Sequence, residues 1–160
     1  MKNIIEYQWI GVQHVTKISQ LAICLTHEII ERTGVKHFDI DIAHSEVLCR
    51  NFIEQEKYYV LAAFKDQEVI GFGALCESYA LYAEGAFGIL QEFFVLPEYR
   101  SQNIGQALIQ QIQHFAESKQ WRRIELCTPP LPEFDRTVVF YQQNGFERTG
   151  GYKMKWVITP

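Results

Sequence analysis

The feature that most limits the fold of this chain is an apolar segment that leads through a turn into a strongly amphipathic stretch. Apolar residues occupy both faces of the segment from Phe87 to Val95, as expected for a central strand that is covered on both sides. From Ile104 to Gln120 the apolar residues recur at helical spacing, which is the strongest helix signal in the sequence. A buried strand that runs into an amphipathic helix favours a layered α/β domain.

Patterns of the same two kinds alternate along the rest of the chain. Strands are predicted over residues 4–10, 58–64, 69–76, 124–127, 146–149 and 152–158, and helices around 18–29, over 42–53 and over 136–143. Asp41 is available to cap the second helix, residues 65–68 form a polar hairpin turn, and residues 77–85 form a longer connection. No repeat, linker or low-complexity tract divides the chain, so residues 1–160 are predicted to form one mixed α/β domain.

The composition argues against several classes of partner. The formal net charge is -4 at pH 7 and no basic cluster is present, so no nucleic-acid partner is expected. The four cysteines are scattered among apolar neighbours without a CxxC pair and are predicted to be buried, reduced thiols. The dispersed histidines show no metal-ligand spacing, so no metal is expected.

The same sequence shows no feature that would bring the protein to a membrane. It has no signal-peptide pattern and no apolar run of about 18 residues, so a cytoplasmic protein with no membrane partner is expected. Whether the chain forms a homodimer is left open.

The turn before the Ile104 helix carries the first functional prediction. A helix that starts in this way directs unpaired N–H groups and the positive end of its dipole at one place, where an anion can bind. Gly105 lets a phosphate approach the backbone closely, and the side chains of Arg100 and Gln102 can add donors. The alternative is structural, with Gly105 only allowing close packing of the helix.

Two segments resemble motifs of the GCN5-related N-acetyltransferase (GNAT) superfamily. The first is similar to that family's strand end and phosphate-binding turn and reads Phe93-Phe94-Val95-Leu96-Pro97-Glu98-Tyr99-Arg100-Ser101-Gln102-Asn103-Ile104-Gly105-Gln106-Ala107-Leu108. The second is similar to an aromatic-Tyr-x-x-x-Gly-Phe segment and reads Phe140-Tyr141-Gln142-Gln143-Asn144-Gly145-Phe146. The resemblance implies a single α/β (α+β) domain with a central, mixed, mostly antiparallel sheet of about six to seven strands, flanked by about four helices.

The resemblance also implies that the chain binds acetyl-CoA as a co-substrate and needs no metal. The residues implied in binding it are Phe93, Phe94, Val95, Arg100, Ser101, Gln102, Asn103, Ile104, Gly105, Gln106 and Ala107. Two positions depart from the family pattern: Asn103 stands where a glycine is usual, and Phe134 where many members have asparagine. Because asparagine tolerates a left-handed backbone better than most residues, the turn is predicted to persist at a modest energetic cost.

Two residues are candidates for catalysis. Tyr141 matches the position whose hydroxyl, in many members of the family, protonates the departing thiolate of coenzyme A; the alternative is an aromatic core residue. Glu92 stands in the apolar run of the predicted pantetheine strand, where burial would raise its pKa toward the range of a general base. The alternative for Glu92 is a buried carboxyl paired with a backbone donor or an arginine.

Contacts with the acceptor are predicted from the connection over residues 77–85 and, secondarily, from the first helix. The candidates are Glu77, Tyr79, Tyr82 and Glu84, followed by His27 and Glu28. Arg136 is predicted either to meet a coenzyme phosphate or to pair with Asp135 or Glu133.

The function that these residues imply is acetyl transfer from acetyl-CoA to a primary amine of a small molecule. Acetylation of a protein or peptide, and a non-catalytic acyl-CoA-binding sensor or interaction module, stay open as alternatives.

Overall fold

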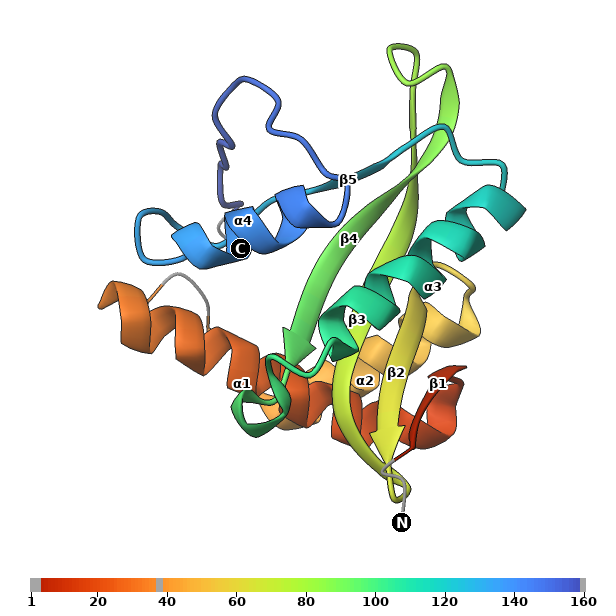
Figure 1. The fold of residues 1–160 in the computed structure, drawn as a ribbon, viewed down its shortest axis with the longest axis vertical. Helices are drawn as coiled ribbons and strands as arrows, with labels where there is room; N and C mark the ends of the chain where they lie inside the picture. Colours follow the sequence, from red (N-terminus) through yellow and green to blue (C-terminus); the bar gives the residue numbers. More distant parts are fainter. Residues whose placement is uncertain (1–3, 37–38, 159–160) are drawn as a thin grey trace.

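A computed structural model describes residues 4–36 and 39–158 and shows one mixed sheet with helices on both faces (Figure 1). The sheet has five strands in the order β1 (Ile5–Trp9), β2 (Tyr59–Lys65), β3 (Glu68–Ala80), β4 (Gly85–Val95) and β5 (Ile124–Leu126). The first four strands pair antiparallel, whereas β5 runs parallel to β4. The predicted mixed, mostly antiparallel α/β fold is confirmed, with fewer strands than expected.

Helices cover the sheet as the sequence periodicity requires. They are α1 (Val15–Thr33), α2 (Ile42–Glu54), α3 (Ile104–Ser118) and α4 (Asp135–Gln143), with short 3-10 turns η1 (Val12–His14) and η2 (Pro97–Tyr99). In Figure 1, α3 lies on one face of the sheet and α1 and α2 lie on the other. The Asp41 side chain accepts hydrogen bonds from the N–H groups of Ala43 and His44, which confirms the predicted cap of α2.

Two apolar clusters hold these layers together. Ile104, Leu108 and Ile112 of α3 pack on one face of the sheet in the first cluster. Val15 and Ile18 of α1 pack on the other face in the second. The sheet is therefore buried on both faces, and the strand over residues 85–95 pairs with a neighbour on each side.

The connection predicted over residues 77–85 is wrong. The strands β3 and β4 continue to the register pair of Ala80 and Gly85, and the turn between them is confined to residues 81–84. The polar side chains of residues 77–85 suggested a loop. The backbone of a hairpin can, however, stay paired where its side chains face solvent.

The predicted terminal strand pair over residues 146–149 and 152–158 is also absent from the described part of the chain. Residues 147–158 have no regular secondary structure, and all of them are exposed. The sheet therefore lacks the two strands that would have brought it to the predicted number, because an alternating pattern by itself does not specify which strand a segment pairs with.

The prediction that every cysteine is buried is corrected as well. All four are free thiols, but only Cys49 is buried, while Cys24 and Cys127 are exposed and Cys76 is half-buried. Apolar sequence neighbours do not fix the side of an element on which a residue lies. Among the described residues, no cluster of His, Cys, Asp and Glu is suited to a metal ion, and no helix has the length and apolar character to cross a membrane.

Candidate active site

The turn between β4 and α3 presents unpaired backbone donors at one place. Ser101 and Asn103 both adopt left-handed backbone conformations with φ of 63°, and α3 begins directly after Asn103. The first helical hydrogen bond runs from Ala107 N–H to Asn103 C=O at 3.0 Å, so the N–H groups that precede it have no acceptor within the helix. The predicted left-handed Asn103 is confirmed, and the start of α3 has the geometry of an anion site.

Arg100 connects this turn to α1 and to the sheet. Its Nε donates to the Val95 carbonyl at 2.8 Å, and one terminal nitrogen donates to Glu28 Oε1 at 2.9 Å. The guanidinium also lies 5.3 Å from the centre of the Phe94 ring. In the same turn Gln102 donates to the Glu98 carbonyl at 3.3 Å. Both predicted side-chain donors therefore have partners in the protein, and the backbone N–H groups at the start of α3 are further donors for a phosphate.

Gly105 lies where α3 meets α4. A Cβ at this position would come within 3.0 Å of Phe140 Cζ and 3.7 Å of Phe93 Cε1, so the structure shows the close packing that was the structural alternative for Gly105. The ring centres of Phe93 and Phe140 are 5.7 Å apart. The fold thus brings the predicted pantetheine strand, the turn and the Tyr141 helix to one place.

Tyr141 lies in an aromatic cluster on the α3 side of β4. It is 8% exposed, and its ring centre is 6.0 Å from that of Phe93 and 5.6 Å from that of Phe146. Burial raises the pKa of Tyr141 above its ordinary value of 10.0. The hydroxyl therefore keeps its proton at neutral pH, as a proton donor must.

A β-bulge in β4 determines where Glu92 points. Ala74 of β3 pairs with Glu92 whereas Leu75 pairs with Leu90, so Gln91 has no partner across the two strands. Leu90 packs in the α3-side cluster and Phe94 in the α1-side cluster. The Gln91 amide donates to Cys76 Sγ at 3.3 Å. Glu92 follows this bulge and shares the face of Phe94, so it lies on the side of the sheet opposite to Phe93.

The Glu92 carboxyl is held by a residue that the sequence did not single out. Tyr58, just before β2, donates a hydrogen bond from its hydroxyl to Glu92 Oε2, and the Tyr58 ring packs edge-on against Phe52 of α2 at 5.5 Å. Burial raises the pKa of Glu92 from 4.5 to about 7. The pKa of the neighbouring Cys49 thiol is raised to about 11, mainly by burial and to a smaller extent by the charge of Glu92.

Neither alternative predicted for Glu92, a backbone donor or an arginine, describes this contact. A tyrosine at the start of a strand is common, so only the pairing of β2, β3 and β4 could have revealed Tyr58 as the partner.

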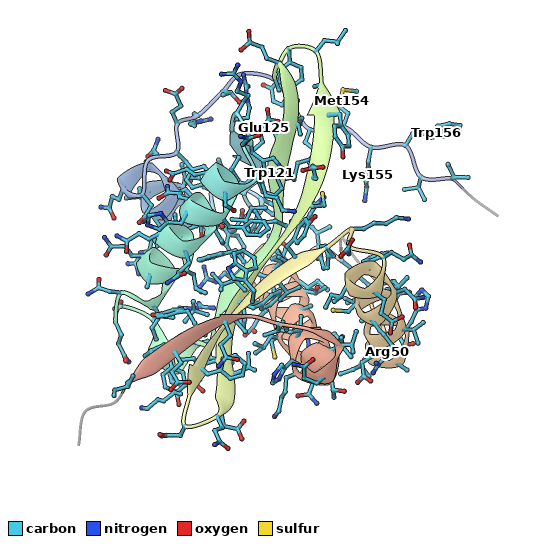
Figure 2. The ribbon with its side chains drawn as sticks, turned by 90° about the vertical axis from the view of Figure 1, so that its right-hand side faces the viewer. Arg50, Trp121, Glu125, Met154, Lys155 and Trp156 are labelled. Atoms are coloured by element: carbon cyan, nitrogen blue, oxygen red, sulfur yellow. The ribbon has the colours of Figure 1, made fainter. Side chains whose placement is uncertain are left out.

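The predicted acceptor residues gather at the other end of the β3–β4 hairpin. Glu77 accepts hydrogen bonds from the Tyr79 hydroxyl at 2.5 Å and from the Trp121 indole at 2.6 Å, and Tyr82 donates to Glu125 at 3.0 Å. Trp121 and Glu125 are labelled in Figure 2. Glu84 lies in the turn next to Gly85, and from Gly85 to Glu92 the strand spans roughly 23 Å at about 3.3 Å per residue. Glu77 pairs with Gly88, about 13 Å along the strand from Glu92, so none of Glu77, Tyr79, Tyr82 and Glu84 is brought into contact with Glu92.

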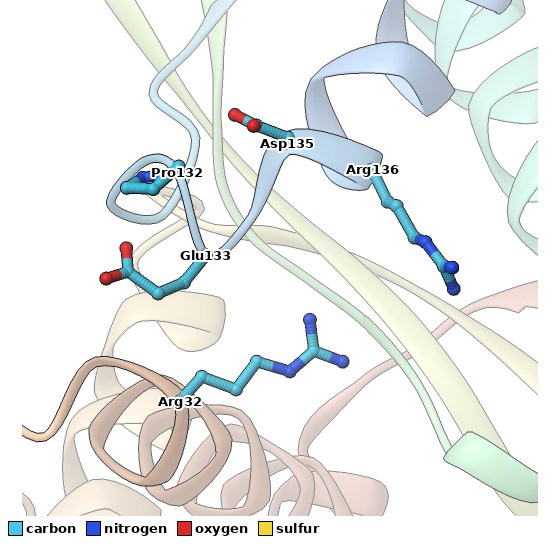
Figure 3. Close-up of a pocket in the computed structure, with 5 residues that line it drawn as sticks. All are labelled: Arg32, Pro132, Glu133, Asp135 and Arg136. Atoms are coloured by element: carbon cyan, nitrogen blue, oxygen red, sulfur yellow. The ribbon is translucent and has the colours of Figure 1, made fainter.

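A surface hollow of about 590 Å³ separates the end of α1 from the start of α4 (Figure 3). Its walls are formed by Arg32, Pro132, Glu133, Asp135 and Arg136. Arg32 lies 4.8 Å above the ring of Phe134, which is 3% exposed, so the residue that departs from the family pattern is part of the core here. In Figure 3 the Arg136 side chain points away from both carboxylates, which does not support the local pairing predicted as one alternative.

Of the secondary acceptor candidates on α1, Glu28 lies at the turn and His27 is exposed. Glu28 accepts from Arg100 and forms a second ion pair with Arg32 at 3.6 Å. This carboxylate therefore links the turn before α3 to the hollow beside α4.

The sequence profile of the acetyltransferase (GNAT) domain family matches residues 55–148, which include β2 to α4 and therefore Glu92, the turn and Tyr141. The chain belongs to the GNAT family. It is an N-acetyltransferase, and members of this family use acetyl-CoA. Among curated protein sequences none matches the chain significantly.

Solved structures of GNAT proteins share the whole fold. An aminoglycoside acetyltransferase from an uncultured soil metagenomic sample, in complex with trehalose, is 19% identical with a TM-score of 0.78 over 99% of both chains. The aminoglycoside N-acetyltransferase AAC(6')-Iy in complex with CoA is 18% identical with a TM-score of 0.80 over 98% of this chain and 97% of that one.

A ribosomal-protein-alanine N-acetyltransferase from Brucella melitensis biovar Abortus 2308 is 14% identical with a TM-score of 0.71, over 96% of this chain and 100% of that one. At these identities the likeness establishes the GNAT fold.

Proposed function

We propose that this GNAT protein transfers the acetyl group of acetyl-CoA directly to a primary amine of a small molecule. The observation that carries the proposal is the position of Glu92, a carboxyl with a pKa of about 7 that follows the bulge in β4. Its neighbour Phe93 contacts Tyr141 on the opposite side of the same strand. A candidate base and a candidate acid thus lie at neighbouring positions on the two faces of β4.

The backbone at the start of α3 supports binding of the coenzyme. The N–H groups of Ile104, Gly105 and Gln106 would hold the pyrophosphate, and backbone groups of Phe93 to Val95 would orient the pantetheine. Arg100 would act by fixing the turn through Val95 and Glu28 rather than by binding phosphate itself.

Glu92 lowers the cost of the first proton transfer. An alkyl ammonium has a pKa near 10.4, and moving its proton to a carboxylate of pKa 4.5 costs about 8 kcal/mol, compared with about 5 kcal/mol for a carboxylate of pKa about 7. The amine nitrogen then attacks the thioester carbonyl carbon, a C–N bond forms and the C–S bond breaks. The Tyr141 hydroxyl donates its proton to the departing thiolate, the second proton lost by the attacking nitrogen restores the Tyr141 hydroxyl through solvent, and Glu92 releases its proton to water.

A cationic acceptor suits the charge of the protein. The chain carries a formal net charge of -4 at pH 7, and the structures with the same fold include aminoglycoside acetyltransferases, one of them in complex with sisomicin. Aminoglycosides and polyamines are therefore the first acceptors to test. A cytoplasmic location is part of the proposal, because two of the free cysteines are exposed and a reducing compartment keeps such thiols free.

Two measurements test the proposal. Titration with acetyl-CoA, followed by calorimetry, should give saturable binding below millimolar concentration, and its absence would contradict any acyl-CoA function. Release of the CoA thiol should then be followed with aminoglycosides, polyamines, amino acids and peptides. Turnover with peptides alone would indicate a protein N-acetyltransferase, and binding without turnover on any acceptor would indicate a sensor.

A further inference from the structure

The bulge in β4 places two consecutive polar side chains, those of Gln91 and Glu92, on one face of the sheet. In a regular strand, neighbouring side chains point to opposite faces. Cys76 of β3 lies between Leu75, which packs in the α3-side cluster, and Glu77, which bonds an indole of that cluster, so Cys76 faces the α1 and α2 side. The Gln91 amide reaches Cys76 Sγ at 3.3 Å, and the Glu92 carboxyl lies on this same face.

Both side chains are open to a ligand on this face. Gln91 is exposed and Glu92 is half-buried. The contact with Cys76 uses the amide nitrogen of Gln91, and within the described residues no hydrogen bond ends on its Oε1. An amide oxygen has two lone pairs, so Gln91 Oε1 is available to accept from a donor group of a bound molecule.

The neighbours of this pair give the site two chemical parts. The Tyr58 hydroxyl donates to Glu92 Oε2, so the other carboxyl oxygen has acceptor capacity left for an amine. Ile89 pairs with Cys76 across the two strands and is half-buried, so an apolar side chain lies next to the amide. The face thus offers a carboxyl and an amide oxygen side by side, next to a hydrocarbon surface.

We propose that Gln91 determines acceptor specificity and that the preferred acceptor is a 1,2-amino alcohol. The amine of the acceptor would lie at Glu92, and the hydroxyl on the neighbouring carbon would donate to Gln91 Oε1. Consecutive residues have Cα atoms about 3.8 Å apart, which suits two donors that stand on adjacent carbons. The inference rests on the proposed role of Glu92 as the base.

Matched pairs of acceptors test the role of Gln91. Ethanolamine is compared with propylamine, and glucosamine with cyclohexylamine, by measuring kcat and KM in the wild type and in Gln91→Met. Methionine keeps the length of the side chain but removes the amide oxygen. In Gln91→Met the ratio of kcat/KM between the hydroxylated and the plain amine should fall by about threefold to tenfold, through KM, because one neutral hydrogen bond is lost. The different basicities of the amines affect both proteins equally and cancel in this comparison.

Two variants separate recognition from damage to the strand. Gln91→Glu keeps an acceptor oxygen and should keep the wild-type ratio, while a second carboxylate beside Glu92 should move the rise of the pH profile to higher pH. Gln8→Met replaces an exposed glutamine of β1 and should leave all constants at their wild-type values.

The outcomes distinguish this inference from the proposed function. An unchanged ratio in Gln91→Met, an equal loss for both members of a pair, or wild-type turnover only with amines that lack a neighbouring hydroxyl would overturn the role of Gln91 and leave the acetyl transfer standing. A wild type that turns over no amine at all would contradict the proposed function itself.

Discussion

Replacing Glu92 by glutamine tests the role of the buried carboxyl in this GNAT protein. Glutamine keeps the shape and can still accept the hydrogen bond from Tyr58, but it cannot take a proton. Loss of a general base lowers kcat by about 10² to 10⁴. The rate of CoA thiol release with the best acceptor of the panel should therefore fall by this factor, with little change in the Kd for acetyl-CoA.

The wild-type pH profile should report the pKa of Glu92 directly. With a pKa of about 7, about 9% of the carboxyl is ionised at pH 6 and about 91% at pH 8, so kcat/KM should rise about tenfold between them. Tyr58→Phe removes a donor to the ionised form and should move this rise to higher pH by about one to two units, since a hydrogen bond to a charge contributes about 1.5–3 kcal/mol.

The Glu92 carboxyl should also lower the free energy of unfolding at neutral and higher pH. Its folded pKa of about 7 exceeds the ordinary value of 4.5, so the folded state binds the proton more tightly and the wild type loses stability as pH rises from about 4.5 to about 7. Thermal unfolding should show Glu92→Gln more stable than the wild type at pH 8, by up to about 3 kcal/mol, and no such gain at pH 4.

Glu117→Gln is the matched control, because Glu117 is an exposed carboxylate on α3 whose ion-pair partner is His114. Its activity and stability should equal those of the wild type. An unchanged kcat in Glu92→Gln, or a pH profile that is flat between pH 6 and 8, would show that another group takes the proton.

Three further substitutions probe the rest of the site. Tyr141→Phe should lower kcat by about 10² or more with little change in acetyl-CoA affinity, and unaltered turnover would remove its assigned role. Asn103→Ala should cost about 1 kcal/mol in chemical unfolding and weaken acetyl-CoA binding, whereas Asn103→Gly should not, because only the alanine is strained at φ 63°. Gly105→Val places a side chain against Phe140 and should destabilise the fold by about 1–3 kcal/mol; Gly150→Ala, with nothing within 4 Å, is its control.

Local signals in the sequence predicted much of this protein. The amphipathic pattern located α3 from its first residue, and Asp41 marked the start of α2. The left-handed conformation of Asn103 followed from its place where the resembled family has glycine and from the tolerance of asparagine for that backbone. Each of these features depends on residues within one or two helical turns of each other, so the local sequence is enough to predict it.

Side-chain direction and pairing required the tertiary structure. The bulge at Gln91 exists only in the pairing of β3 with β4, and it decides which face Glu92 shares with Tyr58. The raised pKa of Glu92 likewise comes from burial by segments distant in sequence, and no local pattern reports it.

The terminal residues show that a local pattern can also predict an element that the structure lacks. Alternation between Tyr152 and Ile158 predicted a strand, but the structure leaves this segment exposed and without regular secondary structure. The sequence by itself determined the fold class, the left-handed turn before α3 and the family to which the chain is similar. The tertiary structure alone decided which side chain contacts Glu92 and that residues 152–158 stay unpaired, because both depend on pairing between segments far apart in the chain.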